Sequence, residues 1–530
     1  MQPPKTLTTT LLRVHSTWLV TILAFFWFAA STWSWPLLLP DEGRYVGVAW
    51  NMLSQEEWGV PLLNGLPFFH KPPLFYWLTA SSLWAFGPNE WAARLASVLG
   101  ATVMVAAVFW FLKAHASRLH AVIAALILAV QPFVFGASHY ANLDMLVAGI
   151  ITATIVLAAS AALRRESAQA YKGVLAMAYV ALALGFLAKG LIGIVLPAGV
   201  IGVWLLARGR MRSLVSLLWL PGFALLFVVA LPWMVAMQVR YEGFFDYYIL
   251  YQHFHRYIEG GFNNARPFWF YLPVLLVLTL PWSLQLWRLF QRQYWAGEKD
   301  LALRSLMAVW FVLILVFFSI PNSKLAGYVL PCVPPLAYFI ADIFARRLDG
   351  EGIQRASRAL SICTMVSAAI CLGAVVALTL ANRPSSKDLA LQLNSLIQEG
   401  DQVVMLNRIH YDLNFYLRTS HPAWVVADWN AADIAKTDNW RKELYDAAPF
   451  EPSLAGRLLV VHDALLGRLC MTSGGSYWLI GDGSALDGHP ELRSVEPLVS
   501  GGGLHAWRVD EQTRSQLCGA RTRIAMDVTD

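Results

Sequence analysis

Residues 40–73 read PDEGRYVGVAWNMLSQEEWGVPLLNGLPFFHKPP, and they begin where the first long apolar run of the chain ends. Asp41 and Glu42 therefore stand at the mouth of a predicted membrane helix. Desolvation beside hydrocarbon disfavours a charged carboxylate, so acids kept in such a place commonly have a function. A structural alternative is equally open, because apolar residues follow at helical spacing from Tyr45 to Leu53 and Asp41 is placed to be a simple N-cap.

The composition of the whole chain is that of an integral membrane protein. It is 57% hydrophobic and 14% charged, with a mean hydropathy of +0.51, outside the usual balance of a soluble globular protein. Apolar runs recur near the ~20 residues that a helix needs to cross ~30 Å of hydrocarbon. We expect a mainly α, polytopic fold with eleven membrane helices, at about 17–36, 92–112, 120–137, 144–163, 173–188, 191–207, 213–237, 268–287, 302–320, 326–344 and 358–381.

The placement of Lys and Arg predicts the orientation. In a membrane protein the placement of basic residues is more informative about orientation than the net charge, which is +6 here. We do not interpret this net charge as a sign of nucleic-acid binding. The basic residues concentrate in the loops after every second run, at 113–118, 164–172, 208–212, 288–299 and 346–358. By the positive-inside rule the N-terminus is cytoplasmic, and the external segments are 37–91, 138–143, 238–267, 321–325 and everything after about 382.

The composition and hydrophobic pattern of the sequence change after residue 381. A helix-like stretch, SSKDLALQLNSLIQEG, is followed by short β-rich runs at 403–406, 424–427, 458–461, 477–480 and 505–509. We therefore predict a transmembrane domain at 1–381, with structured external loops at 37–91 and 238–267, and a soluble external α/β domain at 382–530. An oxidising compartment would permit a disulfide between Cys470 and Cys518, but the sequence does not show that they are close.

Several charged residues are predicted together at the outer rim of the membrane. They are Asp41, Glu42, Lys71, Asp144, Lys189, His253, Arg256 and Lys324. Singly they have structural interpretations: Asp144 as an N-cap, and Lys189 and Lys324 as lysines that reach an interface. Together, cations beside carboxylates suit a substrate with a phosphate. An external site cannot rely on ATP or nucleotide sugars, and the chain has no phosphate-binding glycine loop, so the activated donor would be a lipid.

A series of motifs adds a family resemblance over about residues 15–345. DEGRY, FHKPPLFYW, YANLDM, GFLAKGLIGIVLP, the HFHRY and RPFWFYLPVLL stretches and SIPNSKLAGYVLP follow in that order. Their combination resembles the bacterial polyprenyl-phosphate-dependent GT-C glycosyltransferases, nearest to the lipid A aminoarabinose transferase group and related to protein O-mannosyltransferases. The resemblance implies inverting transfer of a sugar from undecaprenyl phosphate to lipid A, another glycan or a protein, on the periplasmic face of the bacterial inner membrane.

The resemblance also implies roles for individual residues. Those matching catalytic or acidic motif positions are Asp41, Glu42 and Asp144, and those matching donor-phosphate positions are Lys71, Arg256 and Lys324. His70 stands where relatives often have Glu, and with His253 it forms a candidate pair of zinc ligands. Two ligands are few for a zinc site, and a hydrogen-bonded loop histidine is the alternative for His70.

Two other classes of function compete with transfer. A flippase or transporter of lipid-linked sugars would bind the same lipid without making a bond. It predicts a polar path across the membrane at helix breaks, whereas most Gly and Pro breaks of this chain lie at helix ends. A structural module that recruits envelope partners would tolerate loss of every rim charge.

Overall fold

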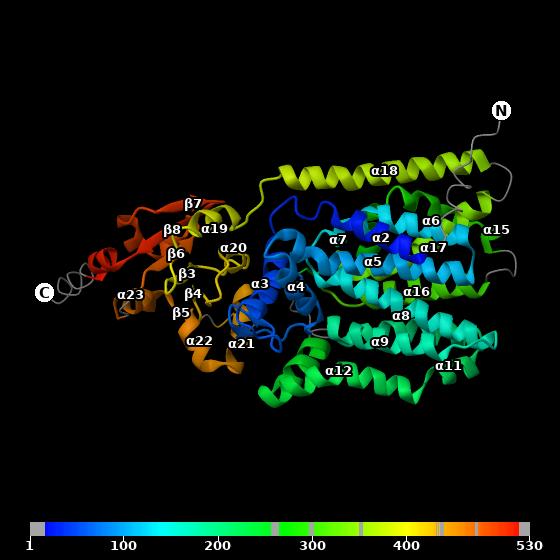
Figure 1. Cartoon of the computed structure of the whole chain (residues 1–530), viewed down its shortest axis with the longest axis horizontal. Helices are drawn as coiled ribbons and strands as arrows, with labels where there is room; N and C mark the ends of the chain where they lie inside the picture. The colour runs from blue at the N-terminus through cyan, green and yellow to red at the C-terminus, as the bar shows by residue number, and fades with distance from the viewer. Residues whose placement is uncertain are drawn as a thin grey trace.

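The computed structural model describes residues 16–255, 264–295, 301–348, 353–430, 432, 434, 439–471 and 475–518, with the side chains at 253–255 and 293 excepted. Two parts follow one another along the longest axis of the molecule (Figure 1). One is a bundle of long helices, and the other is a smaller part built on a β-sheet, with elements of the 37–91 segment between them. The prediction of a mainly helical protein with a C-terminal α/β region is confirmed.

The helical part contains α2 (Thr17–Ala29), α5 (Glu90–His115), α6 (Arg118–Val130), α7 (Pro132–Ser138), α8 (Leu143–Glu166), α9 (Lys172–Lys189), α10 (Ile192–Ala207), α11 (Met211–Leu217), α12 (Leu220–Arg240), η1 (Asp246–His255), η2 (Phe268–Phe270), α14 (Tyr271–Leu278), η3 (Trp282–Phe290), α15 (Arg292–Trp295), α16 (Leu301–Ser319), η4 (Ala326–Cys332), α17 (Val333–Leu348) and α18 (Ile353–Leu380).

Each of the eleven predicted runs coincides with one, two or three consecutive helices. Within the described ranges, seven spans are long and apolar enough to cross a membrane: α5, α8, α9, α12, α16, η4 with α17, and α18. An eighth is formed by α6 and α7, which bend by 58° where Pro132 interrupts the helix. The shorter apolar helices α2, α10 and η2–α14 occupy the other three runs. The chain is therefore a multi-pass membrane protein, with four of its runs short or bent.

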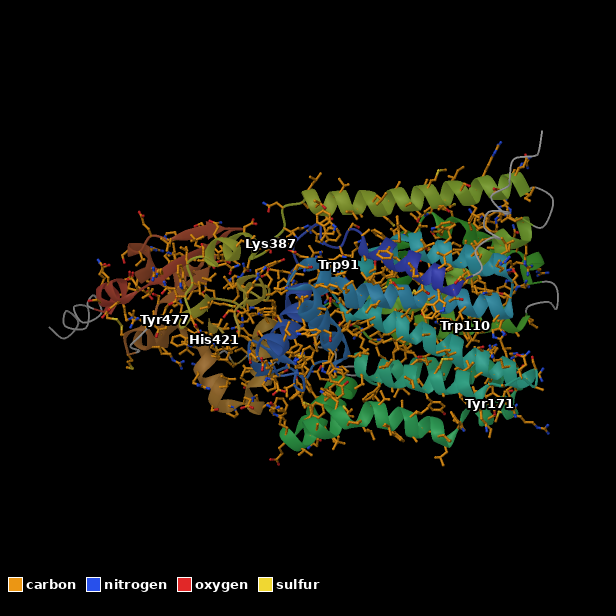
Figure 2. All side chains as sticks on the ribbon, viewed as in Figure 1. Trp91, Trp110, Tyr171, Lys387, His421 and Tyr477 are labelled. Carbon is orange, nitrogen blue, oxygen red and sulfur yellow. A yellow bond between two sulfur atoms is a disulfide. The ribbon has the colours of Figure 1, made fainter. Side chains whose placement is uncertain are left out.

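Close backbone contact between α5 and α8 forms the centre of the bundle. Gly100 of α5 faces Gly149 of α8, and a Cβ on Gly149 would overlap the carbonyl oxygen of Gly100. Small residues allow such an approach, which van der Waals packing rewards in a membrane. Trp91 and Trp110 lie toward the two ends of α5 (Figure 2), as expected for aromatic side chains at the two membrane–water interfaces.

The rim of the bundle carries a small cap. It consists of α3 (Asp41–Ser54), a hairpin of β1 (Leu62–Leu63) and β2 (Leu66–Pro67), and α4 (Leu74–Phe86). Asn64 and Gly65 turn the hairpin with positive φ angles of 49° and 83°. The Asn64 side chain continues into the C-terminal part, because it donates to the carbonyl of Ala423 (2.8 Å) and accepts from its amide (2.9 Å). The cap is thereby joined to both parts of the molecule.

The C-terminal part contains α19 (Lys387–Leu393), β3 (Gln402–Leu406), α20 (Leu413–Leu417), β4 (Trp424–Val426), α21 (Trp440–Ala447), η6 (Ala448–Phe450), α22 (Pro452–Leu458), β5 (Leu459–Val460), α23 (His462–Met471), β6 (Tyr477–Gly481), α24 (Ala485–Gly488), η7 (Pro490–Ser494), β7 (Val499–Gly501) and β8 (Leu504–Val509).

Six strands form one mixed sheet in the order β5-β4-β3-β6-β8-β7. The first four are parallel, and β8 pairs antiparallel with both β6 and β7. The predicted β-rich runs correspond to β3, β4, β5, β6 and β8, whose buried residues are mostly apolar. The sequence reading missed β7, a three-residue edge strand with glycine at its end.

One disulfide within the C-terminal part and one ion pair between it and the bundle stabilise this region. Cys470 of α23 and Cys518 form a disulfide, which the sequence alone left open. At the junction with the bundle, Lys387 of α19 donates to Glu90 at the start of α5 (2.5 Å; Lys387 is labelled in Figure 2). The chain thus returns from α18 to the same rim that carries the cap.

Candidate functional site

A cavity of about 860 Å³ lies between the bundle rim, the cap and the C-terminal part. The predicted residues Asp41, His70 and Lys71 line it from the cap, and Lys189 lines it from the end of α9. Arg408, His410 and Glu443 line it from the C-terminal part. Tertiary folding therefore gathers residues that are far apart in the sequence into one space.

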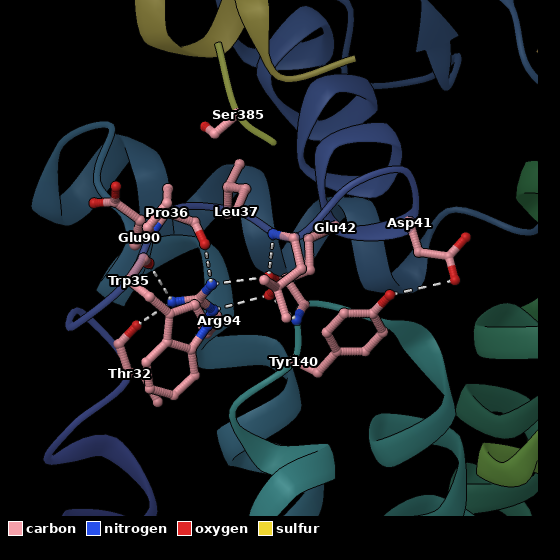
Figure 3. A network of polar contacts seen from close by, with 12 residues as sticks. Thr32, Trp35, Pro36, Leu37, Asp41, Glu42, Glu90, Arg94, Tyr140 and Ser385 are labelled. Atoms are coloured by element: carbon pink, nitrogen blue, oxygen red, sulfur yellow. Dashed lines mark hydrogen bonds and ion pairs between the residues drawn. The ribbon is translucent and has the colours of Figure 1, made fainter. Parts of the chain in front are cut away.

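Asp41 is the first residue of α3 and not its N-cap, a position that Pro40 occupies without a side-chain capping bond. The carboxylate of Asp41 accepts from the guanidinium of Arg44 (2.5 Å) and from the hydroxyl of Tyr140 (3.3 Å; Figure 3). Its side chain keeps 31% of its surface exposed. The N-cap alternative is thus wrong, and the acid is partly accessible in the cavity.

Arg44, which the sequence reading did not single out, bridges two carboxylates. It pairs with Asp41 on its own helix and with Glu443 of α21. The hydroxyl of Tyr411 donates to the other oxygen of Glu443 (2.5 Å). Burial acts to lower the pKa of Arg44, but Glu443 and, after it, Tyr45, Tyr411 and Asp41 outweigh burial and hold that pKa well above its ordinary value. The i,i+3 spacing of Asp41 and Arg44 was the available signal for this pair.

Glu42 faces away from Asp41 and is completely buried (Figure 3). Both of its oxygens accept from Arg94 of α5 (2.8 Å each), and backbone amides of Leu38 and Ala141 also donate to it. Arg94 in turn donates to backbone carbonyls in the segment between α2 and α3. Glu42 does not line the cavity. These contacts connect α3, α5 and the loop before α8, and they do not support the predicted contact of Glu42 with a substrate.

Asp144 and Lys189 form a second ion pair at the rim. The N-cap of α8 is Asn142, whose side chain accepts from the amide of Asp144, so Asp144 is not the N-cap considered from the sequence. The carboxylate of Asp144 instead accepts from the Lys189 ammonium. That ammonium also lies 4.2 Å from the ring centroid of Tyr328, a cation–π contact. Asp144 thus contacts Lys189, which lines the cavity.

The remaining predicted phosphate ligands are placed differently from one another. Lys71 lines the cavity. Lys324 is 3% exposed, does not line the cavity, and donates to the carbonyls of Arg266 and Pro321. Desolvation lowers the pKa of Lys324. The predicted residue Arg256 lies outside the described residues.

The predicted metal pair gains no further ligand in the described part of the chain. There, no group of three or more His, Cys, Asp and Glu side chains is arranged to hold a metal ion. The His70 ring stacks on Phe68, with 4.5 Å between ring centroids. The side chain of His253 lies outside the described residues, although its backbone belongs to η1. The donor set that is described does not fit zinc, and we derive no step through a metal.

The chain is similar in sequence to known proteins. Residues 18–248 match the family described as dolichyl-phosphate-mannose-protein mannosyltransferase. An undecaprenyl phosphate-α-4-amino-4-deoxy-L-arabinose arabinosyl transferase of Edwardsiella ictaluri is 31% identical over 345 residues, covering 65% of this chain and 61% of that protein. A relative of the same name from Pseudomonas fluorescens is 32% identical, covering 67% and 62%. The aligned part thus spans less than two thirds of these relatives.

The fold is similar to that of solved structures over almost its full length. The crystal structure of ArnT from Cupriavidus metallidurans bound to undecaprenyl phosphate superposes with a TM-score of 0.75 at 23% identity, covering 93% of this chain and 98% of that one. The archaeal oligosaccharyltransferase AglB from Archaeoglobus fulgidus superposes with a TM-score of 0.56 at 12% identity, covering 89% and 70%. The chain is thus similar in sequence to the mannosyltransferase family over residues 18–248 and to the undecaprenyl-phosphate aminoarabinose transferases over about two thirds of its length, and its fold is similar to that of ArnT.

Proposed function

We propose that the chain is an inverting glycosyltransferase that moves a sugar from an undecaprenyl-phosphate donor to lipid A or another envelope acceptor. The observation that carries this proposal is that Asp41, Lys71 and Lys189 line one shared cavity at the membrane rim. A lipid phosphate at the rim can reach cations there while its chain stays in the membrane. Because the relatives are 4-amino-4-deoxy-L-arabinose transferases, 4-amino-4-deoxy-L-arabinose is the first sugar to test.

In this proposal Asp41 acts on the acceptor. Its partly exposed carboxylate accepts a proton from an acceptor hydroxyl, a role that typically contributes about 10²–10⁴-fold to a rate. An acceptor that is already an anionic phosphate needs little deprotonation, and Asp41 then positions and orients it. Arg44 and Tyr140 hold the carboxylate by hydrogen bonds from two sides.

Lys71 and Lys189 bind the donor phosphate and stabilise the charge that develops on it as the leaving group. Asp144 orients Lys189 through their ion pair. Arg256 remains a predicted third phosphate ligand. Lys324 would need to leave its two carbonyl partners before it could reach a phosphate in the cavity. Glu42 is assigned a positioning role, because Arg94 and two backbone amides occupy its carboxylate.

The proposed location is the bacterial inner membrane, with the N-terminus cytoplasmic and the rim, the cavity and the 382–530 domain periplasmic. The Lys and Arg pattern of the loops supports this orientation. Accessibility labelling of single cysteines placed at 388 and 210 tests it. A periplasmic 388 and a cytoplasmic 210 are expected, and the reverse pattern contradicts the orientation.

Mass spectrometry of lipid A and total envelope glycans tests the function. Cells with the wild-type chain, with Asp41→Asn, or without the protein are compared. A pentose or hexose addition that only the wild type supports identifies the sugar and the acceptor together. If all three samples match while undecaprenyl-linked sugar accumulates on one leaflet in cells without the protein, transfer is wrong and the chain transports the lipid.

A further inference from the structure

In the sheet of the C-terminal part, the direction in which successive strands are added along the chain reverses between β3 and β6. From β3 the chain adds β4 and then β5 on one side, and it then places β6 on the other side of β3. All four strands are parallel, so their carboxyl ends share one edge. In open α/β sheets, ligands bind outside the carboxyl ends at such a switch point. The strand order thus marks a crevice between the ends of β3 and β6.

This crevice faces the cavity that contains Asp41. The residues directly after β3, from Arg408 to Tyr411, line that cavity. Tyr411 packs closely on α3, because a Cβ on Gly47 would lie 2.8 Å from its carbonyl oxygen. Side-chain contacts join the two loops of the crevice: Arg408 pairs with Asp482 (2.9 Å), and Asn407 donates to the carbonyl of Ser484 (3.1 Å).

Two side chains after β3 have unused capacity to bind a ligand. Arg408 pairs with Asp482 and still exposes 53% of its side chain. His410 lines the cavity and is only 4% exposed, and its Nε2 has no hydrogen-bond partner among the residues that the structure describes. Burial, and secondarily Arg408, lower the pKa of His410 to about 4, so the neutral ring offers a hydrogen bond and no charge at pH 7. A buried polar atom without a partner is costly, which favours a ligand that supplies one.

An aromatic side chain lies on the same wall. Trp440, the first residue of α21, lines the cavity half-buried and packs edge-on against Trp429. An indole face suits the apolar face of a sugar ring, and its edge-to-face neighbour fixes its orientation. A guanidinium, a neutral imidazole and an indole therefore share the wall away from the membrane helices.

We propose that the cavity wall formed by the C-terminal part, beside this switch point, is the binding site for the glycan head of the acceptor, a saccharide with an anionic substituent. Arg408 binds the anionic group, His410 Nε2 bonds a sugar hydroxyl, and Trp440 packs on a ring face. The site rests on the proposed function, since the acceptor is defined by it. The donor is held by Lys71 of the cap and by Lys189 at the end of α9, and not by the C-terminal part, so this wall can bind an acceptor beside Asp41 without competing for the lipid phosphate.

Kinetics with the full chain in proteoliposomes tests the site. Arg408→Gln, His410→Leu and Trp440→Leu are assayed with the acceptor and the donor varied separately. Each variant is expected to raise the apparent KM for the acceptor at least tenfold, while kcat and the KM for the donor stay within twofold. Arg493→Gln is the matched control, because Arg493 also pairs with an aspartate (3.6 Å), is 63% exposed and does not line the cavity. An unchanged acceptor KM in all three variants, or an equal rise in the donor KM, overturns the site.

A binding measurement separates this site from the proposed transfer. Calorimetry of the detergent-solubilised full chain uses a soluble phosphorylated disaccharide, with the unphosphorylated sugar and inorganic phosphate as further arms. Arg408→Gln is expected to weaken binding of the phosphorylated sugar at least tenfold, and Arg493→Gln to leave it unchanged. Binding of phosphate alone as tightly as the phosphorylated sugar contradicts a glycan site. If the phosphorylated sugar binds through Arg408 but no transfer is found, the proposed function fails and the site remains; if transfer proceeds and neither binding nor the acceptor KM responds, only the site fails.

Discussion

Glu443 of α21 and Arg44 of α3 form an ion pair across the boundary between the C-terminal part and the membrane-rim cap. Their side chains are only 8% and 18% exposed. Because Arg44 also holds Asp41, the C-terminal part reaches the proposed catalytic carboxylate through one intervening side chain. The C-terminal α/β region is thereby part of the candidate site.

Glu443→Gln is expected to destabilise the boundary and to lower transfer. The change removes the charge that partners Arg44 and an acceptor for Tyr411, and breaking a largely buried ion pair costs on the order of 3 kcal/mol. Limited proteolysis of the solubilised chain, with the release of the C-terminal part as readout, measures the stability. Glu496→Gln, at an exposed position, is the control. Equal proteolysis rates for the two variants would contradict this coupling.

Asp41→Asn is expected to reduce the transfer rate by about 10²-fold or more without loss of folded protein. The amide keeps the size of the side chain and removes the proton acceptor, while Arg44 retains Glu443 as its partner. Single-turnover assays in proteoliposomes measure the rate. Asp487→Asn, a matched change at a side chain that is 80% exposed, is expected to be neutral. Wild-type rates in a correctly inserted Asp41→Asn chain would refute its role.

Glu42→Gln is expected to show the opposite pattern. It leaves the completely buried Arg94 charge without its carboxylate, a loss typically of about 3–5 kcal/mol. We expect a much lower yield of folded chain, with activity per folded molecule reduced less than in Asp41→Asn. A thiol-reactive dye reports the unfolding, because Cys332, Cys363 and Cys371 are buried and free. A stable Glu42→Gln chain without transfer would restore a direct catalytic role for Glu42.

Gly327→Ala is expected to lower transfer without removing any charge. A Cβ at this position of η4 would overlap the Asp144 carboxylate and displace it from Lys189. We expect weaker binding of the donor, measured as a raised donor KM with a smaller change in the acceptor KM. Gly373→Ala in α18 is the control, since a Cβ there meets nothing within 4 Å. Equal donor KM values for the two variants would show that the position of Asp144 does not affect donor binding.

Stability of the C-terminal part is expected to fall as the pH falls from about 6.5 toward 4. The folded-state pKa of His410 is lowered to about 4, so the unfolded chain takes up this proton first on acidification. The stability that depends on neutral His410 is complete above about pH 6.5 and is lost through this window, in total on the order of 3 kcal/mol. Hydrogen exchange of the β3 amides measures this loss of stability. The charged groups that act on His410 are Arg408 and Asp482. His410→Leu is expected to flatten this pH dependence, and an unchanged slope would contradict the assignment.

The sequence by itself determined the helical membrane part, the C-terminal α/β region and most of its strands. Each of these follows from local information: apolar runs of membrane length, alternation in short runs, and turn residues between them. It also indicated the positions of Asp41, Lys71 and Lys189 at one rim, because the helix ends fix the membrane depth of a residue. The bend at Pro132 and the short helices α2 and α10 show that run length alone does not determine helix length.

Only the tertiary structure decided what each rim residue contacts. Asp41 and Glu42 are neighbours in sequence, but successive residues of a helix point about 100° apart, so one reaches the cavity and the other reaches Arg94. The pairing of Arg44 with Glu443 joins residues 399 positions apart, and no local pattern encodes such a contact. The crevice beside His410 likewise depends on the order in which strands pair, which hydrophobic patterning leaves undetermined.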